Sequence, residues 1–330
     1  MSDSKLRIGI LSTAHMHVWA YVSGLREHPR AEIVGVWDDD VERGEEFAQK
    51  TGLPFTGFLS DLLAAVDAVV ITSENNGHTE LVETAARADK HILCEKPLIA
   101  RSEDASRMER AVQASTSKFM TAFPCRFSPA YRRLAERVRS GEIGRIRGIS
   151  ATNRGRCPGG WFIKAELSGG GAMIDHVVHV TDLLRDLLAE EPALVQAQIG
   201  NNVYGQEWDD TAMLTIQFPS GIFATLDSSW SRPPTFKTWG DVTMTVTGEN
   251  GVIELDMFGS GLDHYHEGAP NHSLVSYGTD LDAAMVTAFV EACLDGSEVP
   301  VTLHDGLQAS RVALAGYVSA REGRAVAIGN

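Results

Sequence analysis

Short apolar runs alternate with amphipathic stretches over the first third of the chain. The runs RIGIL, EIVGVW, AVVIT, HILC and KFMTAF carry apolar residues at successive positions, and the stretches between them have helical periodicity. Strands that are apolar on both faces and alternate with helices are typical of a parallel sheet with helices on each side. The pattern predicts a doubly wound α/β Rossmann domain over residues 1–123, whose ligand lies at the carboxyl ends of the strands.

The pattern changes after Phe123. Residues 128–144 predict a helix, residues 145–155 a strand, and residues 172–188 a strongly periodic helix. From Ala193 onward, several strand-like runs are separated by turn sequences such as PSG and GENG, which favours a mostly antiparallel sheet. Two further helices are expected around Leu281–Leu294 and His304–Ala320. Residues 124–330 therefore form, in this interpretation, an α+β domain with an open sheet covered by helices on one face.

Composition narrows the function classes. The chain has 330 residues, enough for two domains, and 43% of them are hydrophobic. A formal charge of −15 argues against nonspecific nucleic-acid binding, so the expected partner is a small molecule or another protein. No signal peptide or membrane span is recognised, and the four cysteines are scattered. We therefore expect a cytoplasmic protein with reduced thiols.

The loop after the first strand, LSTAHMH, stands where a dinucleotide-binding loop reads G-x-G-x-x-G. Ser12 and Ala14 are small, so the backbone can approach a pyrophosphate closely if neither residue needs a positive φ. His17 is large, and its side chain must point away from the strand or hold the following helix further out.

Asp38 ends the second strand-like run. A carboxylate at this place accepts hydrogen bonds from both ribose hydroxyls and repels a 2′-phosphate, which favours NAD over NADP. Asp39 and Asp40 add negative charge, and no nearby arginine is expected to compensate it. The alternative is that Asp38 caps the next helix.

Four segments resemble the glucose–fructose oxidoreductase, inositol dehydrogenase and MocA (Gfo/Idh/MocA) family. They are KHILCEKPLIA, ITSENNGH, CRFSPAYRRLAERVRSGEIGRI and SGGGAMIDHVVHVTDLLRDL. The resemblance extends from about residue 6 to residue 320. It implies an NAD(P)-binding Rossmann domain, a substrate domain, and oxidation or reduction of a secondary alcohol or ketone on a sugar, cyclitol or related polyol. It also implies a homodimer or homotetramer formed through the open face of the second-domain sheet.

The resemblance implies that residues after the third strand contact the cofactor, although ENNGH also fits a turn followed by a helix cap. The expected cofactor-binding residues are Ser12, Thr13, Ala14, His15, Asp38, Ser73, Asn75, His78, Glu95 and Lys96.

The resemblance also implies the catalytic residues. Lys96 follows a strand and would stabilise a developing alkoxide, and the Lys96–Pro97 bond is expected to be cis. Asp175 and His179 are four positions apart, so they share a helix face. His179 is assigned as general acid/base, while Asp175 orients the substrate or the imidazole. The run Gly169–Gly171 would let the chain approach the nicotinamide closely.

Further polar and aromatic residues are candidates for the substrate pocket. Trp161 would stack on a sugar ring or belong to the core, and Trp239 with the segment 227–233 would face either the pocket or a subunit interface. Asp182 would bind the other ring nitrogen of His179 or be an ordinary polar helix position. The expected pocket residues are Arg126, Tyr131, Trp161, Lys164, Asp175, His176 and His179.

Two other functions fit the sequence. One is a redox-neutral lyase or glycosidase that holds NAD tightly. The other is a metal-dependent hydrolase or a binding protein, because two histidines and a carboxylate can bind a catalytic metal. His15 and His17 would point to different sides of a helix and converge only in an extended loop, so no metal is expected. The histidines considered are His15, His17, His176 and His179, with a further group at His264, His266 and His272.

Overall fold

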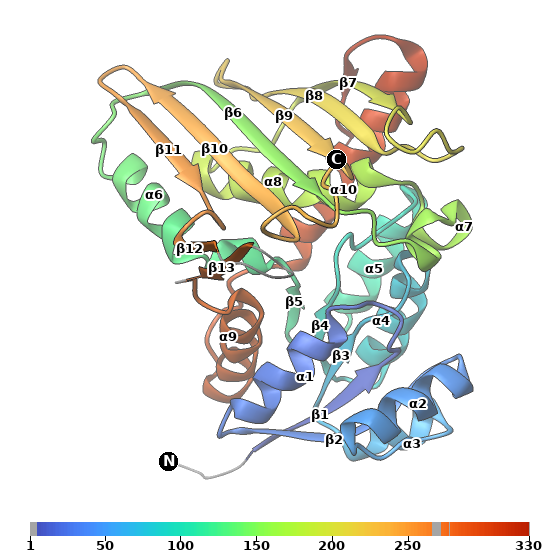
Figure 1. The fold of residues 1–330 in the computed structure, drawn as a ribbon. Helices are drawn as coiled ribbons and strands as arrows, with labels where there is room; N and C mark the ends of the chain where they lie inside the picture. The colour runs from blue at the N-terminus through green and yellow to red at the C-terminus, as the bar shows by residue number, and fades with distance from the viewer. Residues whose placement is uncertain (1–4, 266–271, 277, 330) are drawn as a thin grey trace. The chain divides into compact units, whose positions relative to one another are not determined.

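The computed structural model describes residues 5–265, 272–276 and 278–329. The chain divides into two compact units, each shown by its strands and helices in Figure 1. Unit 1 comprises Met1–Pro124 and Asp280–Leu307, and unit 2 comprises Cys125–Thr279 and Gln308–Asn330. Among the described residues, no helix combines the length and the apolar character needed to cross a membrane.

Unit 1 contains the predicted parallel sheet. Its five strands lie in the order β2-β1-β3-β4-β5, and every neighbouring pair is parallel. Because β1 lies between β2 and β3, the loops after β1 and β3 flank the point where the strand order reverses, which is where such sheets bind ligands. The strands are β1 (Leu6–Leu11), β2 (Ala31–Trp37), β3 (Ala68–Ile71), β4 (His91–Cys94) and β5 (Phe119–Thr121). The helices between them are α1 (Val18–Glu27), α2 (Val41–Thr51), α3 (Leu59–Ala65), α4 (His78–Arg87) and α5 (Glu103–Gln113).

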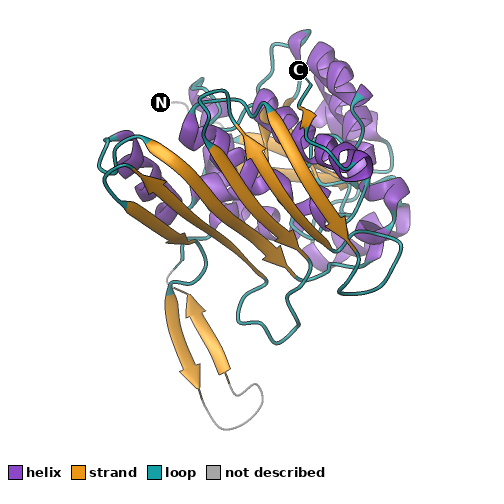
Figure 2. Cartoon of the chain, turned by 90° about the horizontal axis from the view of Figure 1, so that it is seen from above, coloured by secondary structure: helices purple, strands orange, loops and turns teal. Residues whose placement is uncertain are grey.

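Unit 2 is built on a sheet of seven strands in the order β11-β10-β6-β9-β8-β7-β14, which Figure 2 shows side by side. All pairs are antiparallel except β6 with β9. Along β8, buried and exposed residues alternate, because α8 packs on one face and the other face is open. The strands are β6 (Ile146–Gly155), β7 (Leu194–Gly200), β8 (Thr211–Gln217), β9 (Phe223–Ser229), β10 (Gly240–Gly248), β11 (Val252–Asp256) and β14 (Val326–Ala327). The helices are α6 (Pro129–Arg139), α7 (Ala165–Ser168), α8 (Ala172–Leu188) and most of α10 (Leu303–Glu322).

Several short elements were not predicted. They are α3, α7, β14 and a hairpin of β12 (Gly261–Tyr265) and β13 (His272–Ser276). Each is too short for its hydrophobic residues to show a helical or strand periodicity. Strand pairing or packing against neighbouring elements therefore defines these elements.

The segment Asp280–Leu307 belongs to unit 1, whereas the sequence suggested that everything after residue 123 forms the second domain. The reason is packing of α9 (Leu281–Asp295) on α1. Gly24 permits this close approach, because a Cβ there would lie 2.9 Å from the Cα of Ala283. On α9, Met285 and Val286 are fully buried. The segment after α9 is also held to unit 1, since the backbone N–H of Thr121 donates to the carbonyl of Val301 at 3.0 Å.

We expect Gly24→Ala to destabilise the protein by about 1–3 kcal/mol, because the added methyl group presses on the backbone of α9. Urea denaturation measures the free energy of unfolding. Gly57→Ala is the matched control, since a Cβ at Gly57 has no neighbour within 4 Å. Equal stabilities for the two variants would contradict the importance of this helix contact.

Candidate functional site

The loop between β1 and α1 adopts a conformation that glycine usually provides. Ser12 has a φ of 64°, so the condition set for this loop, that neither Ser12 nor Ala14 needs a positive φ, is not met. The loop is fixed to the end of β3: the N–H of His15 donates to the carbonyl of Thr72 at 2.9 Å, and the Thr72 hydroxyl donates to the carbonyl of Ser12 at 2.6 Å. The two loops at the reversal point therefore form one connected surface within unit 1.

Asp38 is buried at the end of β2, and its carboxylate already accepts several hydrogen bonds. The backbone N–H and the hydroxyl of Thr13 each donate to Oδ2 at 2.7 Å. Arg43 donates through Nε at 3.0 Å and through Nη2 at 2.6 Å. The expectation that no arginine compensates Asp38 was therefore wrong. Helix α2 is capped by Asp40, which accepts from the N–H of Arg43 at 3.1 Å, so the alternative cap by Asp38 is also wrong.

The electrostatic balance at Asp38 favours the ionised form. Burial alone would raise the pKa of this carboxyl, but the hydrogen bonds from Arg43 and Thr13 outweigh burial and lower it. A carboxylate offers about four acceptor positions. A ribose hydroxyl can therefore reach Asp38 only by replacing one of its present donors.

The residues expected after β3 and β4 are buried side chains of unit 1. Ser73, Asn75 and His78 have exposed fractions of 3%, 4% and 0%. A short 3-10 turn (Asn75–Gly77) leads into α4, and His78 Nδ1 lies 2.9 Å from the carbonyl oxygen of Pro97, to which it donates. Lys96 is 3% exposed and precedes a cis bond to Pro97, so it is not a solvated surface lysine.

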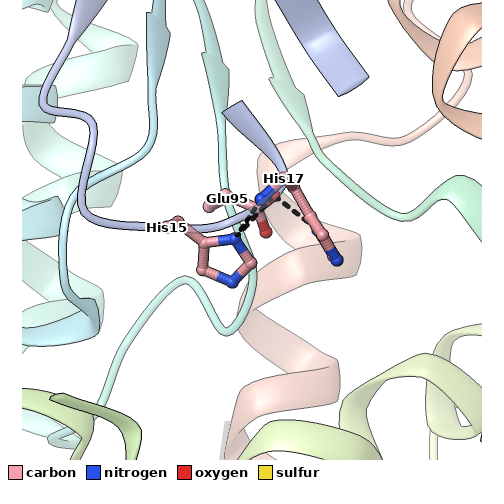
Figure 3. Close-up of side chains that lie close together, drawn as sticks. All are labelled: His15, His17 and Glu95. Atoms are coloured by element: carbon pink, nitrogen blue, oxygen red, sulfur yellow. Dashed lines mark hydrogen bonds and ion pairs between the residues drawn. The ribbon is translucent and has the colours of Figure 1, made fainter. Parts of the chain in front are cut away.

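His15 and His17 converge on Glu95, as Figure 3 shows. Nδ1 of His17 lies 3.0 Å from Oε1 of Glu95, and Nδ1 of His15 lies 3.6 Å from the same atom. The hydroxyl of Tyr21 also donates to Oε1, and the N–H of Lys96 donates to Oε2 at 2.9 Å. We call His15, His17, Tyr21 and Glu95 the histidine–glutamate cluster. Residues 15–17 form a turn in which the N–H of Val18 donates to the carbonyl of His15 at 3.1 Å, so the two imidazoles converge without the extended loop that was expected to be necessary.

Glu95 is ionised despite having no exposed side-chain surface. Burial alone would raise the pKa of its carboxyl, but His15, His17 and Lys96 outweigh burial and lower it well below the ordinary value. Burial alone would lower the pKa of His17, and the neighbouring Glu95 raises it instead. At the start of α9, burial raises the pKa of Asp282 to about 6.

In unit 2, the run Gly169–Gly171 leads into α8. A Cβ at Gly170 would overlap with the Tyr317 hydroxyl, and one at Gly171 would overlap with the Asp209 carbonyl. The Asp209 carboxylate accepts from the N–H groups of Gly171 and Met173 at 2.9 and 2.8 Å. These glycines thus permit close packing inside unit 2, a role that the sequence analysis did not anticipate.

Asp175 and His176 form a buried polar group at the start of α8. The indole N–H of Trp230 donates to Oδ2 of Asp175 at 3.0 Å, and Nε2 of His176 lies 3.2 Å from the same oxygen. Nδ1 of His176 faces the carbonyl oxygen of Asn153 at 3.1 Å. Because both ring nitrogens of His176 face acceptors, an imidazolium would satisfy both contacts.

The remaining candidates on α8 and α6 are linked by hydrogen bonds. Arg126 holds Asp182 through two bonds of 2.7 Å, and the Tyr131 hydroxyl donates to Asp186 at 2.5 Å. His179 lies one turn from Asp175, with Nδ1 4.0 Å from Sγ of Cys125. Arg126 and Tyr131 thus hold α8 in place, a contribution to the fold that the sequence analysis did not assign to them.

Aromatic side chains pack beside Asp175. Trp161 stacks on Phe162 with ring centroids 3.9 Å apart, and both adjoin the fully buried Trp230. Trp208 meets Trp230 edge to face at 5.4 Å. Lys164 is exposed, and Trp239 is 48% exposed. Trp208 and the role of Trp230 were not predicted from the sequence. The run EWDD, an aromatic residue beside two carboxylates before a strand, was the available signal.

The four histidines proposed for a metal site divide between the units. His15 and His17 belong to unit 1, and His176 and His179 belong to unit 2. Of the other group, His264 lies exposed on β12 and His272 is on β13, while His266 lies outside the described residues.

Comparison with known proteins gives two matching family models. Residues 8–123 match a model described as an oxidoreductase family with an NAD-binding Rossmann fold, and residues 131–254 match a GFO/IDH/MocA C-terminal domain.

Individual relatives agree with these models. The chain is 29% identical to inositol 2-dehydrogenase of Rhizobium meliloti, over 80% of this chain and 82% of that protein. It is 27% identical to the uncharacterized oxidoreductase YrbE of Bacillus subtilis, over 93% and 92% of the two chains. The structure of GenD2 from gentamicin A biosynthesis, in complex with NAD, superposes with a TM-score of 0.89 at 23% identity, covering 99% of this chain and 97% of GenD2. At that identity the superposition shows a common fold.

Proposed function

Because the chain belongs to the GFO/IDH/MocA oxidoreductase family, we propose that it transfers a hydride between NAD and a secondary alcohol or ketone of a sugar, cyclitol or related polyol. The observation that carries the proposal is the match of both domain models, in order, to one chain. The name of the similar inositol 2-dehydrogenase supports the polyol class of substrate. A redox-neutral lyase and a metal-dependent hydrolase are not favoured, since these relatives are oxidoreductases.

The residues of unit 1 fit a dinucleotide. Ser12 supplies the positive φ that a glycine would otherwise provide, and Thr13 and Ala14 follow it in the loop. Asp38, at the end of β2, would accept from a ribose hydroxyl after one of the hydrogen bonds from Arg43 is given up. We assign the cofactor to the surface formed by the loops after β1 and β3. The other residues that we expect to bind it are His15, Ser73, Asn75, His78, Glu95 and Lys96. When bound, NAD supplies the acceptor for the hydride.

The chain's own groups would move the proton and hold the substrate. We assign proton transfer to Nε2 of His179, because Nδ1 of this ring faces Cys125. Lys96 would donate from Nζ to the substrate oxygen and stabilise its negative charge. Asp175, held through Oδ2 by Trp230, would accept a substrate hydroxyl at Oδ1 and so fix the orientation of the ring. Trp161, Lys164, His176 and Arg126 remain candidates for the pocket wall.

The purified enzyme is expected to form NADH from NAD when supplied with members of a panel of inositols and aldoses. His179→Ala should lower kcat by about 10²–10⁴-fold while NAD affinity stays nearly unchanged, because the variant removes only the proton acceptor. Steady-state kinetics and a fluorescence titration with NADH measure the two quantities.

The matched control is His28→Ala, because His28 ends α1 at the amino end of the sheet and should leave kcat unchanged. Parallel losses of kcat and NAD affinity in His179→Ala would remove the acid/base assignment. NAD released on denaturation of a protein that forms no NADH with any polyol would favour the redox-neutral alternative.

We infer a preference for NAD over NADP, set by Asp38 and moderated by Arg43. Asp38→Ala should weaken NAD more than NADP, because it removes the ribose acceptor and the charge that repels a 2′-phosphate. Arg43→Ala should shift the ratio of the two affinities in the opposite direction, because it leaves the Asp38 charge uncompensated. Dissociation constants for both dinucleotides test this pair, and shifts of the same sign would contradict the assignment.

We also propose a homo-oligomer formed through the open face of the unit 2 sheet. Met213 and Phe223 are 56% and 50% exposed on this face, beside an ion pair of Arg154 with Asp227. Phe223→Glu is expected to lower the molar mass measured by light scattering toward that of one chain, because it places a charge in the interface. A monomeric wild-type protein would refute the proposed oligomer.

A further inference from the structure

We propose that His15, His17 and Glu95 form a binding site for a divalent transition metal of the zinc class within unit 1. The three residues each offer one ligand atom, and these atoms lie within 4.8 Å of one another. The site uses no residue of unit 2, and the inference does not depend on the oxidoreductase activity.

The geometry is close to that of a bound metal. Zinc binds histidine nitrogen and carboxylate oxygen at about 2.0–2.2 Å, so neighbouring ligand atoms around it are about 3–4 Å apart. Oε1 of Glu95 lies 3.0 Å from Nδ1 of His17 and 3.6 Å from Nδ1 of His15. Figure 3 shows both imidazoles directed toward the carboxylate from one loop. Small rotations of the imidazoles would bring the three atoms onto one ion.

The protonation pattern suits a cation at this place. The backbone N–H of His17 donates to Nδ1 of His15 at 3.2 Å, so that nitrogen is unprotonated and its lone pair is engaged by this N–H. The Glu95 carboxylate only accepts, so Nδ1 of His17 carries the proton that joins them. On binding, the metal takes the place of the proton on Nδ1 of His17, and this proton leaves to solvent. The backbone N–H of His17 also gives up its hydrogen bond to Nδ1 of His15. Three coordination bonds form, and no electron is transferred.

The surroundings position the ligands as the outer shell of a metal site does. Tyr21 and the N–H of Lys96 both donate to Glu95, which fixes the orientation of the carboxylate. Side-chain exposed fractions of 1% for His15, 0% for Glu95 and 31% for His17 leave access from the His17 side.

The assignment of His15 and Glu95 to the cofactor surface does not by itself account for the convergence of both imidazoles on a buried carboxylate. The usual loop holds glycines so that the backbone approaches the pyrophosphate, and no step of hydride transfer needs an imidazole at residue 15 or 17. Two histidines that converge on a buried carboxylate form the ligand set of known metal sites in which two histidines and one carboxylate bind a single ion.

The experiment titrates the full chain, stripped of metal and free of dinucleotide, with Zn²⁺ by isothermal calorimetry, and with Co²⁺ by visible absorption. Wild-type protein should bind one Zn²⁺ per chain and give the Co²⁺ bands of a site with fewer than six ligands. His17→Ala should bind Zn²⁺ about 100-fold more weakly, since outer-shell changes alone cost 10- to 100-fold. His17 is partly exposed, so the variant is expected to fold, and circular dichroism checks this.

His264→Ala is the matched control, because His264 is an exposed histidine on β12 in unit 2 and should bind Zn²⁺ like the wild type. His15→Ala should reproduce the loss seen in His17→Ala. Absence of a one-to-one complex in the wild type, or equal affinity in folded His17→Ala, would overturn the site. Loss in His264→Ala alone would overturn it too and locate the metal on the hairpin. Each of these results leaves the assays of NADH formation unaffected, so the two proposals fail separately.

Discussion

A buried negative charge organises the end of the first sheet. Glu95 has no side-chain surface in contact with solvent, and an isolated carboxylate in that position would be very costly. It is tolerated because His17, Tyr21 and the N–H of Lys96 all donate to it. These bonds attach the loop before α1 and the first turn of α1 to the residue that follows β4. Glu95 also fixes the backbone of Lys96, the residue assigned to the substrate oxygen.

A second buried carboxylate plays the same part at the neighbouring strand. Asp38 is held by Thr13 and Arg43, so the loop after β1 is attached to β2 through a side chain and to β3 through backbone contacts. In unit 2, Asp209 satisfies the first N–H groups of α8, while Trp230 holds Asp175. In each case a buried acidic side chain accepts from donors of another segment and so links the two segments.

The order of the longer strands and helices could be predicted, because uninterrupted apolar runs and a sustained helical period are strong local signals. The family was recognisable from the E-K-P and G-G-G segments, and the matching models confirm it. Partners distant in sequence were not predictable from local patterns. Trp230 on Asp175 and Arg126 on Asp182 are contacts that only the fold creates, whereas Arg43 lies only five positions from Asp38 and was missed despite that proximity. The positive φ of Ser12 was missed for a similar reason, since tertiary contacts impose it on a residue without a local preference for it.

The return of α9 to the first unit has a consequence for the order of synthesis. The sheet of unit 1 is complete once β5 has left the ribosome, but the face of α1 that contains Gly24 gains its covering only after Asp280 has been made. All of unit 2 up to Thr279 is translated in the interval. The nascent chain therefore carries an apolar helix face in need of protection, and a chaperone that shields this face would act during that interval.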